Sequence, residues 1–278
     1  MTETATKSYP NVAQSFGISG IVILAMLLLS PVHFMTRQVI GKEGSMLIYY
    51  LLAMGVSFFI IHLIRKRKTG SSAFFFRVNP GIIPFISLGT LGLLFGIITP
   101  LGLLLPMPDS IKKMFMELIQ QTGPMSFFTM VVAAPIFEEL IFRGIILDGL
   151  LKKYTPVKAI LVSALLFGLV HLNPWQFVTG FILGIFSGWV YCHTRSLLAC
   201  IIIHATANLT GFFMRFIVSD TESLLYNNPN SMYGGYTNFL FVTGGCTALA
   251  LVCIWFLNKE FMKRSRIEQA YDQAIIYI

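Results

Sequence analysis

The sequence predicts an all-α, polytopic membrane protein in which about eight transmembrane helices enclose an intramembrane polar cavity. Hydrophobic residues make up 55% of the chain and charged residues only 12%, about half of the roughly 25% that is typical of a soluble domain. Several apolar runs reach the ~20 residues that a helix needs to cross a bilayer. A soluble protein of this composition would expose too much apolar surface to stay dispersed.

We expect one transmembrane domain, at residues 17–258, with a motif-bearing core at about 120–220. Residues 1–16 precede it as a polar cytoplasmic tail, and residues 259–278 follow it as a basic cytoplasmic end. The first apolar run is interpreted as a span rather than a signal peptide, because only Lys7 precedes it and seven further spans follow. The predicted spans are 17–35, 46–64, 82–105, 124–151, 157–174, 175–193, 196–218 and 238–258.

The basic residues support this even number of spans. With both termini in the cytoplasm, 14 of the 20 Lys and Arg residues fall in inside segments and 5 in outside segments. This asymmetry follows the positive-inside rule and indicates a multi-pass protein of the cytoplasmic (inner) membrane. The net charge of +8 is then a result of topology. The run RKRK at 65–68 is predicted to contact the lipid bilayer rather than nucleic acid, and an amphipathic surface helix is expected at 109–121.

A few polar side chains interrupt the apolar spans. Ionisable groups inside a span are energetically costly, so they normally face a protein interior or a wet cavity. Three of the predicted spans carry such groups at helical spacing: Glu138, Glu139, Arg143, His171, His204 and Asn208.

Helix geometry separates the two adjacent carboxylates. Glu139 and Arg143 are four residues apart, so they share a face and are expected to form a structural ion pair. Glu138 lies about 100° around the helix and has no obvious local partner, which suits a general acid or base. Pro135 withdraws a backbone donor and is expected to kink the span beside Glu138.

The histidines complete a plausible hydrolytic site. His204 and Asn208 share a face and could both donate hydrogen bonds to an oxygen that becomes anionic. His171 could share a water molecule with Glu138, and the two groups could activate that water for attack on a peptide bond. The simpler interpretation of either histidine alone is a hydrogen bond between helices. Three separate spans each carry polar groups at helical spacing, and this combination favours a hydrolytic site over separate hydrogen bonds between helices.

The motifs EELIFR (138–143), FGLVH (167–171) and HATAN (204–208) resemble, in order, the three motifs of the CPBP family. That family comprises type II CAAX-prenyl endopeptidases, Ras-converting-enzyme homologues and bacteriocin-immunity-type membrane proteins. The resemblance covers about residues 120–220. It implies an eight-helix intramembrane endopeptidase with a membrane-associated peptide or protein substrate. Glu138 and His171 would activate water, and His204 with Asn208 would stabilise the oxyanion.

Two alternatives stay open at this point. Glu138, His171 and His204 could form a His₂Glu zinc site, but the chain has no HExxH motif and Asn208 is a poor zinc ligand. Glutamate-based hydrolysis without a cofactor is therefore favoured over a metalloprotease. The second alternative is a non-catalytic membrane protein, either a transporter or a bacteriocin-immunity-type binding protein, that uses the same polar cavity.

Overall fold

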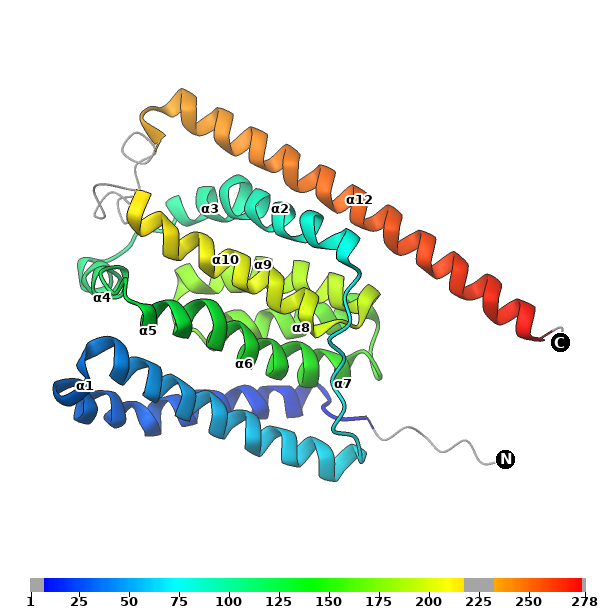
Figure 1. The fold of residues 1–278 in the computed structure, drawn as a ribbon, viewed down its shortest axis with the longest axis horizontal. Helices are drawn as coiled ribbons and strands as arrows, with labels where there is room; N and C mark the ends of the chain where they lie inside the picture. The colour runs from blue at the N-terminus through cyan, green and yellow to red at the C-terminus, as the bar shows by residue number, and fades with distance from the viewer. Residues whose placement is uncertain (1–7, 218–232, 277–278) are drawn as a thin grey trace.

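The computed structural model describes residues 8–217 and 233–276, and every regular element in these ranges is a helix. Figure 1 shows the longer helices side by side, with their axes roughly aligned. The first helix begins, and the last helix ends, at the same end of this bundle (Figure 1). The described part of the chain is therefore all-α, as the composition predicts.

The first element, α1 (Val12–Thr69), is a hairpin of two antiparallel limbs. The helical pattern is broken at Gly41, where φ is 75° and ψ is 173°, a region open to glycine because it has no Cβ. The limbs contact each other through the Tyr49 hydroxyl, which donates a hydrogen bond of 3.0 Å to the carbonyl oxygen of Met26. The first two predicted spans fall one on each limb (Figure 1).

Five helices among the described residues are long and apolar enough to cross a membrane, which supports a multi-pass membrane protein. By length and composition alone, the described helices provide five candidate membrane spans, whereas the sequence predicts eight. The helix α8 (Pro156–Leu169) is apolar but has only 14 residues, which is about 21 Å of helix. The five long helices are α1, Pro80–Leu103, α9 (Pro174–Thr194), the segment Leu197–Phe216 of α10 (Leu197–Ile217), and the segment Tyr236–Arg264 of α12 (Tyr236–Ile276).

Two helical stretches, Pro80–Leu103 and Pro124–Leu150, are each assembled from short pieces. The stretch Pro80–Leu103 consists of η1 (Pro80–Ile82), α2 (Ile83–Leu93), η2 (Leu94–Ile98) and α3 (Thr99–Leu103). The stretch Pro124–Leu150 consists of α5 (Pro124–Phe127), η3 (Phe128–Ala133), α6 (Ala134–Ile141), η4 (Phe142–Leu147) and α7 (Asp148–Leu150). Between them lies α4 (Asp109–Ile119), at the position of the predicted amphipathic helix.

The π-helical turns explain how Pro135 is accommodated. Proline has no N–H, and its ring clashes with the carbonyl four residues earlier in an α-helix. The six residues of η3 immediately precede α6 and have π-helical pairing, so the clash is relieved by a wider turn. The disturbance expected at Pro135 is therefore a π turn, and the same stretch continues through α6.

Small residues allow the helices around the centre of the bundle to approach closely. A Cβ added at Gly184 would lie 2.9 Å from the Cβ of Ala164, and one added at Gly180 would lie 3.2 Å from the Cα of Gly168. These positions bring α8 and α9 into contact, in the way that small residues pack helices in membranes. The glycines in these predicted spans therefore serve packing.

A second close contact joins η2 to α12. A Cβ added at Gly96 would lie 2.5 Å from the backbone nitrogen of Thr247, so the two backbones touch. The Thr247 hydroxyl donates a hydrogen bond of 3.1 Å to the carbonyl oxygen of Gly96. This contact holds α12 against the rest of the bundle.

We expect Gly96→Ala to destabilise the protein by about 1–3 kcal/mol, because the new methyl group would overlap a backbone that cannot move as a side chain can. Gly102→Ala is the matched control, since nothing lies within 4 Å of a Cβ at that position. Thermal unfolding of the two purified variants in detergent measures the difference. Equal melting temperatures for both variants would contradict the close contact.

Candidate active site

The site is built around one buried carboxylate, that of Glu139. Glu139 and Arg143 are each only 1% exposed, and Arg143 Nε lies 3.0 Å from Glu139 Oε2. The pair is formed at the spacing that the sequence predicts. The contact is an ion pair by distance, because Nε does not meet hydrogen-bond geometry. An isolated charge at this depth would be very unfavourable, so each residue requires the other.

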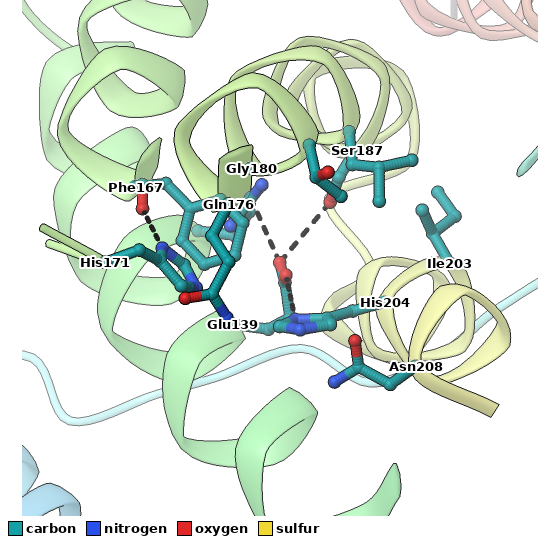
Figure 2. A pocket seen from close by; sticks show the side chains of 12 residues that line it. Glu139, Phe167, His171, Gln176, Gly180, Ser187, Ile203, His204 and Asn208 are labelled. Atoms are coloured by element: carbon teal, nitrogen blue, oxygen red, sulfur yellow. Dashed lines mark hydrogen bonds and ion pairs between the residues drawn. The ribbon is translucent and has the colours of Figure 1, made fainter. Parts of the chain in front are cut away.

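Glu139 also holds two residues from other helices. Its Oε1 lies 3.1 Å from Nδ1 of His204 on α10, and its Oε2 accepts a hydrogen bond of 3.3 Å from the Ser187 hydroxyl on α9. Figure 2 shows these side chains converging on the carboxylate. One acidic group therefore connects three helical stretches and fixes the orientation of the His204 ring.

Glu138 has a different environment from its neighbour. The Tyr50 hydroxyl, on the second limb of α1, donates a hydrogen bond of 2.7 Å to Glu138 Oε1. The second oxygen, Oε2, is buried and has no hydrogen-bond partner among the described residues. His204 Nε2 lies 3.9 Å from this oxygen. The sequence gave no sign of Tyr50, because it lies 88 positions from Glu138 along the chain.

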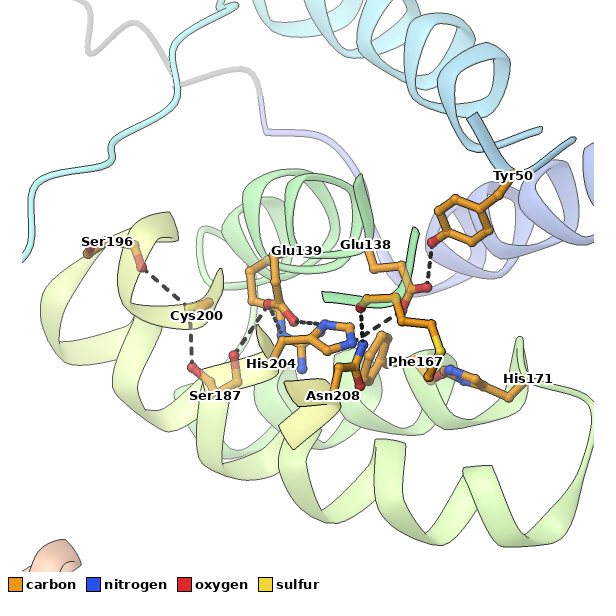
Figure 3. Close-up of polar contacts among 12 residues, drawn as sticks. Tyr50, Glu138, Glu139, Phe167, His171, Ser187, Ser196, Cys200, His204 and Asn208 are labelled. Carbon is orange, nitrogen blue, oxygen red and sulfur yellow. Dashed lines mark hydrogen bonds and ion pairs between the residues drawn. The ribbon is translucent and has the colours of Figure 1, made fainter. Parts of the chain in front are cut away.

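The ring of His204 lies between the two carboxylates (Figure 3). Its Nδ1 faces Glu139 and its Nε2 faces Glu138. A hydrogen on Nδ1 would be donated to Glu139, as is common where an acid orients a histidine. His204 Nε2 is then available to interact with Glu138 or with a molecule that enters the site.

Asn208 lies one turn further along α10, as its spacing from His204 predicts. Its Nδ2 donates a hydrogen bond of 2.7 Å to the carbonyl oxygen of Met130. Met130 belongs to the π-helical η3, and π turns often leave backbone groups available to side chains at functional sites. One amide hydrogen of Asn208 is thus used by the fold, and the second is not committed by this contact.

The Phe167 ring contacts Arg143, His171 and His204. The Arg143 guanidinium lies 4.3 Å from the centre of the Phe167 ring, a cation–π distance. The ring also makes edge contacts with the rings of His171 and His204, at centroid distances of 5.4 and 5.5 Å. Phe167 therefore packs against Arg143, His171 and His204 and helps to hold them in position.

His171 lies just beyond the end of α8. Its Nδ1 is 2.9 Å from the carbonyl oxygen of Phe167, which orients the ring and leaves Nε2 without that constraint. No direct contact joins His171 to Glu138 among the interactions of the described residues, so the predicted partnership of these two groups would require an intervening water.

A cavity of about 120 Å³ lies among these side chains, which is room for a few water molecules. Figure 2 shows its lining side chains around one space. Glu138 is not among its lining residues, and its Oε2 lies 3.9 Å from Nε2 of His204, which lines the cavity. The cavity is lined by Glu139, Arg143, Phe167, His171, Gln176, Thr179, Gly180, Leu183, Ser187, Ile203, His204 and Asn208.

The residues considered for zinc do not form a ligand set. Within residues 8–217 and 233–276, no group of three or more His, Cys, Asp or Glu side chains is placed to hold a metal ion. Glu138, His171 and His204 therefore do not fit the His₂Glu arrangement.

The comparisons with known proteins agree with the motifs. Residues 120–210 match the model of the family described as type II CAAX prenyl endopeptidase, Rce1-like. This range includes all three motifs and every described residue that lines the cavity. No curated protein and no solved structure matches the chain.

We expect Arg143→Met to destabilise the fold by about 3–5 kcal/mol, because it leaves the Glu139 charge buried without its partner. The double variant Glu139→Gln/Arg143→Met should regain a large part of this loss, since the glutamine can still accept hydrogen bonds from His204 and Ser187. Thermal unfolding in detergent measures both variants. A double variant no more stable than the single one would show that the charge is not the cause.

Proposed function

We propose that this chain, whose residues 120–210 form an Rce1-like domain of the CPBP family, is an intramembrane endopeptidase. It would hydrolyse a peptide bond of a membrane-associated peptide or protein with water activated by a glutamate. One observation carries the proposal: Glu138 Oε2 is buried, has no hydrogen-bond partner among the described residues, and lies 3.9 Å from His204 Nε2. A buried carboxylate oxygen without a partner is costly unless water or substrate supplies one.

Glu138 is the proposed general base. Tyr50 holds Oε1 in place, so Oε2 is the atom that takes a proton from the attacking water. The hydroxide adds to the carbonyl carbon of the substrate, and the carbonyl oxygen becomes anionic. Glu138 then passes its proton to the leaving nitrogen as the C–N bond breaks. Water has been added across the peptide bond, and the products are an acid and an amine.

His204 and Asn208 are the proposed donors to the anionic oxygen. The His204 ring can donate from both nitrogens when each carries a hydrogen. In that form Nδ1 donates to Glu139, and Nε2 can donate to the substrate oxygen. The uncommitted amide hydrogen of Asn208 would be the second donor. Fixed donors of this kind usually provide the largest share of catalysis in acyl transfer.

His171 is the proposed second contact of the attacking water. The Phe167 carbonyl orients its Nδ1, and its ring lines the cavity that would hold the water. A histidine in this position can accept a hydrogen bond from the water while Glu138 removes the proton. This keeps the partnership that the sequence predicts, with water as the link.

We also propose eight passes through the membrane, with both chain ends in the cytoplasm. The structure supports the grouping of the basic residues that this topology places inside. Lys152 and Arg195 lie 2.6 and 3.5 Å from the Asp148 carboxylate, and Arg65 lies 3.9 Å from it. The proposed passes are the two limbs of α1, Pro80–Leu103, Pro124–Leu150, α8, α9, α10 and α12.

Two observations favour a non-catalytic binding protein instead. Glu138 does not line the cavity, and one amide hydrogen of Asn208 is bound to the backbone. A binding protein could hold a partner segment in the same place without hydrolysing it. Removal of the Glu138 carboxylate would abolish hydrolysis but would not by itself abolish such binding, so this substitution distinguishes the two functions.

We expect Glu138→Gln to abolish cleavage, with a rate loss of at least ~100-fold, because the amide cannot accept the proton of water. Quantitative proteomics of membranes that contain the wild-type protein or the variant would identify new peptide termini made only by the wild type. Glu117→Gln, which changes an exposed side chain of α4, controls for the loss of charge.

Identical termini in the wild-type and Glu138→Gln membranes would contradict the enzyme and support the binding protein. The same comparison in the presence of a strong chelator tests the metal-free mechanism. Cleavage that disappears on chelation would contradict that mechanism.

We expect Tyr50→Phe to lower kcat by about 10-fold, since a hydrogen bond to a charged group is worth about 1.5–3 kcal/mol. The substrate KM should change little, because Tyr50 contacts the base. Tyr49→Phe is the matched control: it removes the neighbouring hydroxyl, which donates a hydrogen bond to the carbonyl oxygen of Met26. Equal kcat values for the two variants would exclude a positioning role for Tyr50.

A further inference from the structure

A cluster of charged side chains lies outside the candidate active site, at the end of the bundle where α1 and α7 end (Figure 1). Arg65 near the end of α1, Lys152 just after α7 and Arg195 between α9 and α10 surround the Asp148 carboxylate. We call these four residues the Asp148 cluster. It joins three cations to one carboxylate, so two positive charges within the cluster have no counter-charge there.

Arg65 is the buried cation of the Asp148 cluster, with a side chain that is only 6% exposed. Its Nη2 donates a hydrogen bond of 3.0 Å to the carbonyl oxygen of Ala73, and its guanidinium lies 4.7 Å from the centre of the Phe74 ring. Its Nη1 is buried and has no hydrogen-bond partner among the described residues. A buried donor without a partner is unfavourable, so this cluster has both an excess of charge and an excess of donors.

The other two cations are accessible to a ligand. The side chains of Lys152 and Arg195 are 44% and 50% exposed, and each contacts Asp148 through one nitrogen. Arg195 has a φ of 51°, which is unfavourable for any residue other than glycine. The chain thus holds an arginine at a helix end where glycine is usually preferred, and the guanidinium of this arginine lies beside Asp148.

Exposed apolar side chains lie next to the Asp148 cluster. The backbone N–H of Leu197, two residues after Arg195, donates a hydrogen bond of 2.7 Å to the carbonyl oxygen of Phe75. The segment that follows α1 is therefore held against the start of α10. Phe75, Phe76 and Leu198 are exposed at this place. Cations beside exposed apolar side chains fit an amphipathic ligand with an anionic head and hydrocarbon chains.

The position of the cluster in the bundle indicates which amphipathic ligand is available. The ends of membrane-spanning helices lie at the level of the lipid headgroups, and α1, α7, α9 and α10 all begin or end beside this cluster. A guanidinium binds phosphate oxygens as a fork, and an ammonium binds them as a point charge. A free phosphate ion would use the same cations, but it would leave the apolar side chains uncovered.

We propose that the Asp148 cluster is a binding site for the phosphate group of one anionic phospholipid. Lys152 and Arg195 contact the phosphate, Asp148 keeps the cations apart in fixed positions, and the buried charge of Arg65 adds to the attraction. The acyl chains lie along Phe75, Phe76 and Leu198, and the bound lipid connects the end of α1 with α7 and α10. This site does not depend on the proposed hydrolase.

Native mass spectrometry of the full-length protein, released from detergent micelles, measures the Kd of individual lipids. The probes are phosphatidylglycerol, which is anionic, and phosphatidylcholine, which has the same phosphate but no net charge. We expect the first phosphatidylglycerol to bind about 10-fold more tightly, because each unbalanced cation near a headgroup attracts the anionic lipid.

Two double variants separate this site from the general attraction of a basic protein surface. Lys152→Gln/Arg195→Gln leaves the buried Arg65 in place and should reduce the preference for phosphatidylglycerol to less than about 2-fold. Arg67→Gln/Lys68→Gln removes the same number of positive charges from exposed positions near the end of α1 and should keep the preference.

Equal affinity of the wild-type protein for the two lipids would overturn the site, and this comparison requires no variant to fold. An equal loss of preference in both double variants would also overturn it, because binding would then depend on total charge alone. Inorganic phosphate identifies the source of the anion. A lipid site keeps its phosphatidylglycerol at an equal concentration of phosphate, whereas displacement at that concentration would overturn the lipid as the ligand.

Discussion

The whole site depends on the Glu139 carboxylate, which is buried at 1% exposure in a segment surrounded by apolar helices. A single charge in that position would be prohibitive in a membrane protein. Arg143 supplies the opposite charge, and His204 and Ser187 supply hydrogen-bond contacts from α10 and α9. Because these contacts come from three helical stretches, satisfying this one group also fixes how those stretches are arranged. The orientation of the proposed catalytic histidine follows from the same requirement.

The adjacent carboxylates of Glu138 and Glu139 therefore have different surroundings. Successive residues of a helix point about 100° apart, so Glu139 faces Arg143 and α9 while Glu138 faces α1. Tyr50 satisfies one oxygen of Glu138 and leaves the other without a partner in the described structure. The carboxylate of Glu139 holds the architecture, and the incompletely satisfied carboxylate of Glu138 is the one that we propose for catalysis. The π turn before Pro135 contributes to the same division, because the Met130 carbonyl in that turn anchors Asn208.

A second, larger cavity, of about 420 Å³, lies next to the cavity of the candidate site, and the two differ in the polarity of their linings. The smaller one is enclosed by the charged and hydrogen-bonding groups, and the larger one by aliphatic side chains with Arg215 at its edge. Asn208 belongs to both. The helix α10 supplies residues to both linings, so its position sets how the two cavities meet.

The sequence by itself determined the class of protein and predicted the candidate site residues other than Tyr50 and Ser187. Composition and apolar run length indicated a helical membrane protein, and spacing on single helices paired Glu139 with Arg143 and placed Asn208 one turn from His204. These are properties of one helix, which local geometry fixes. Only the tertiary structure decided the contacts between helices: that Glu138 meets His204 and Tyr50, that Glu139 also binds His204 and Ser187, and that α1 reverses at Gly41. Such contacts depend on the packing of distant segments, and helical periodicity specifies which face a side chain occupies but not which helix that face will meet.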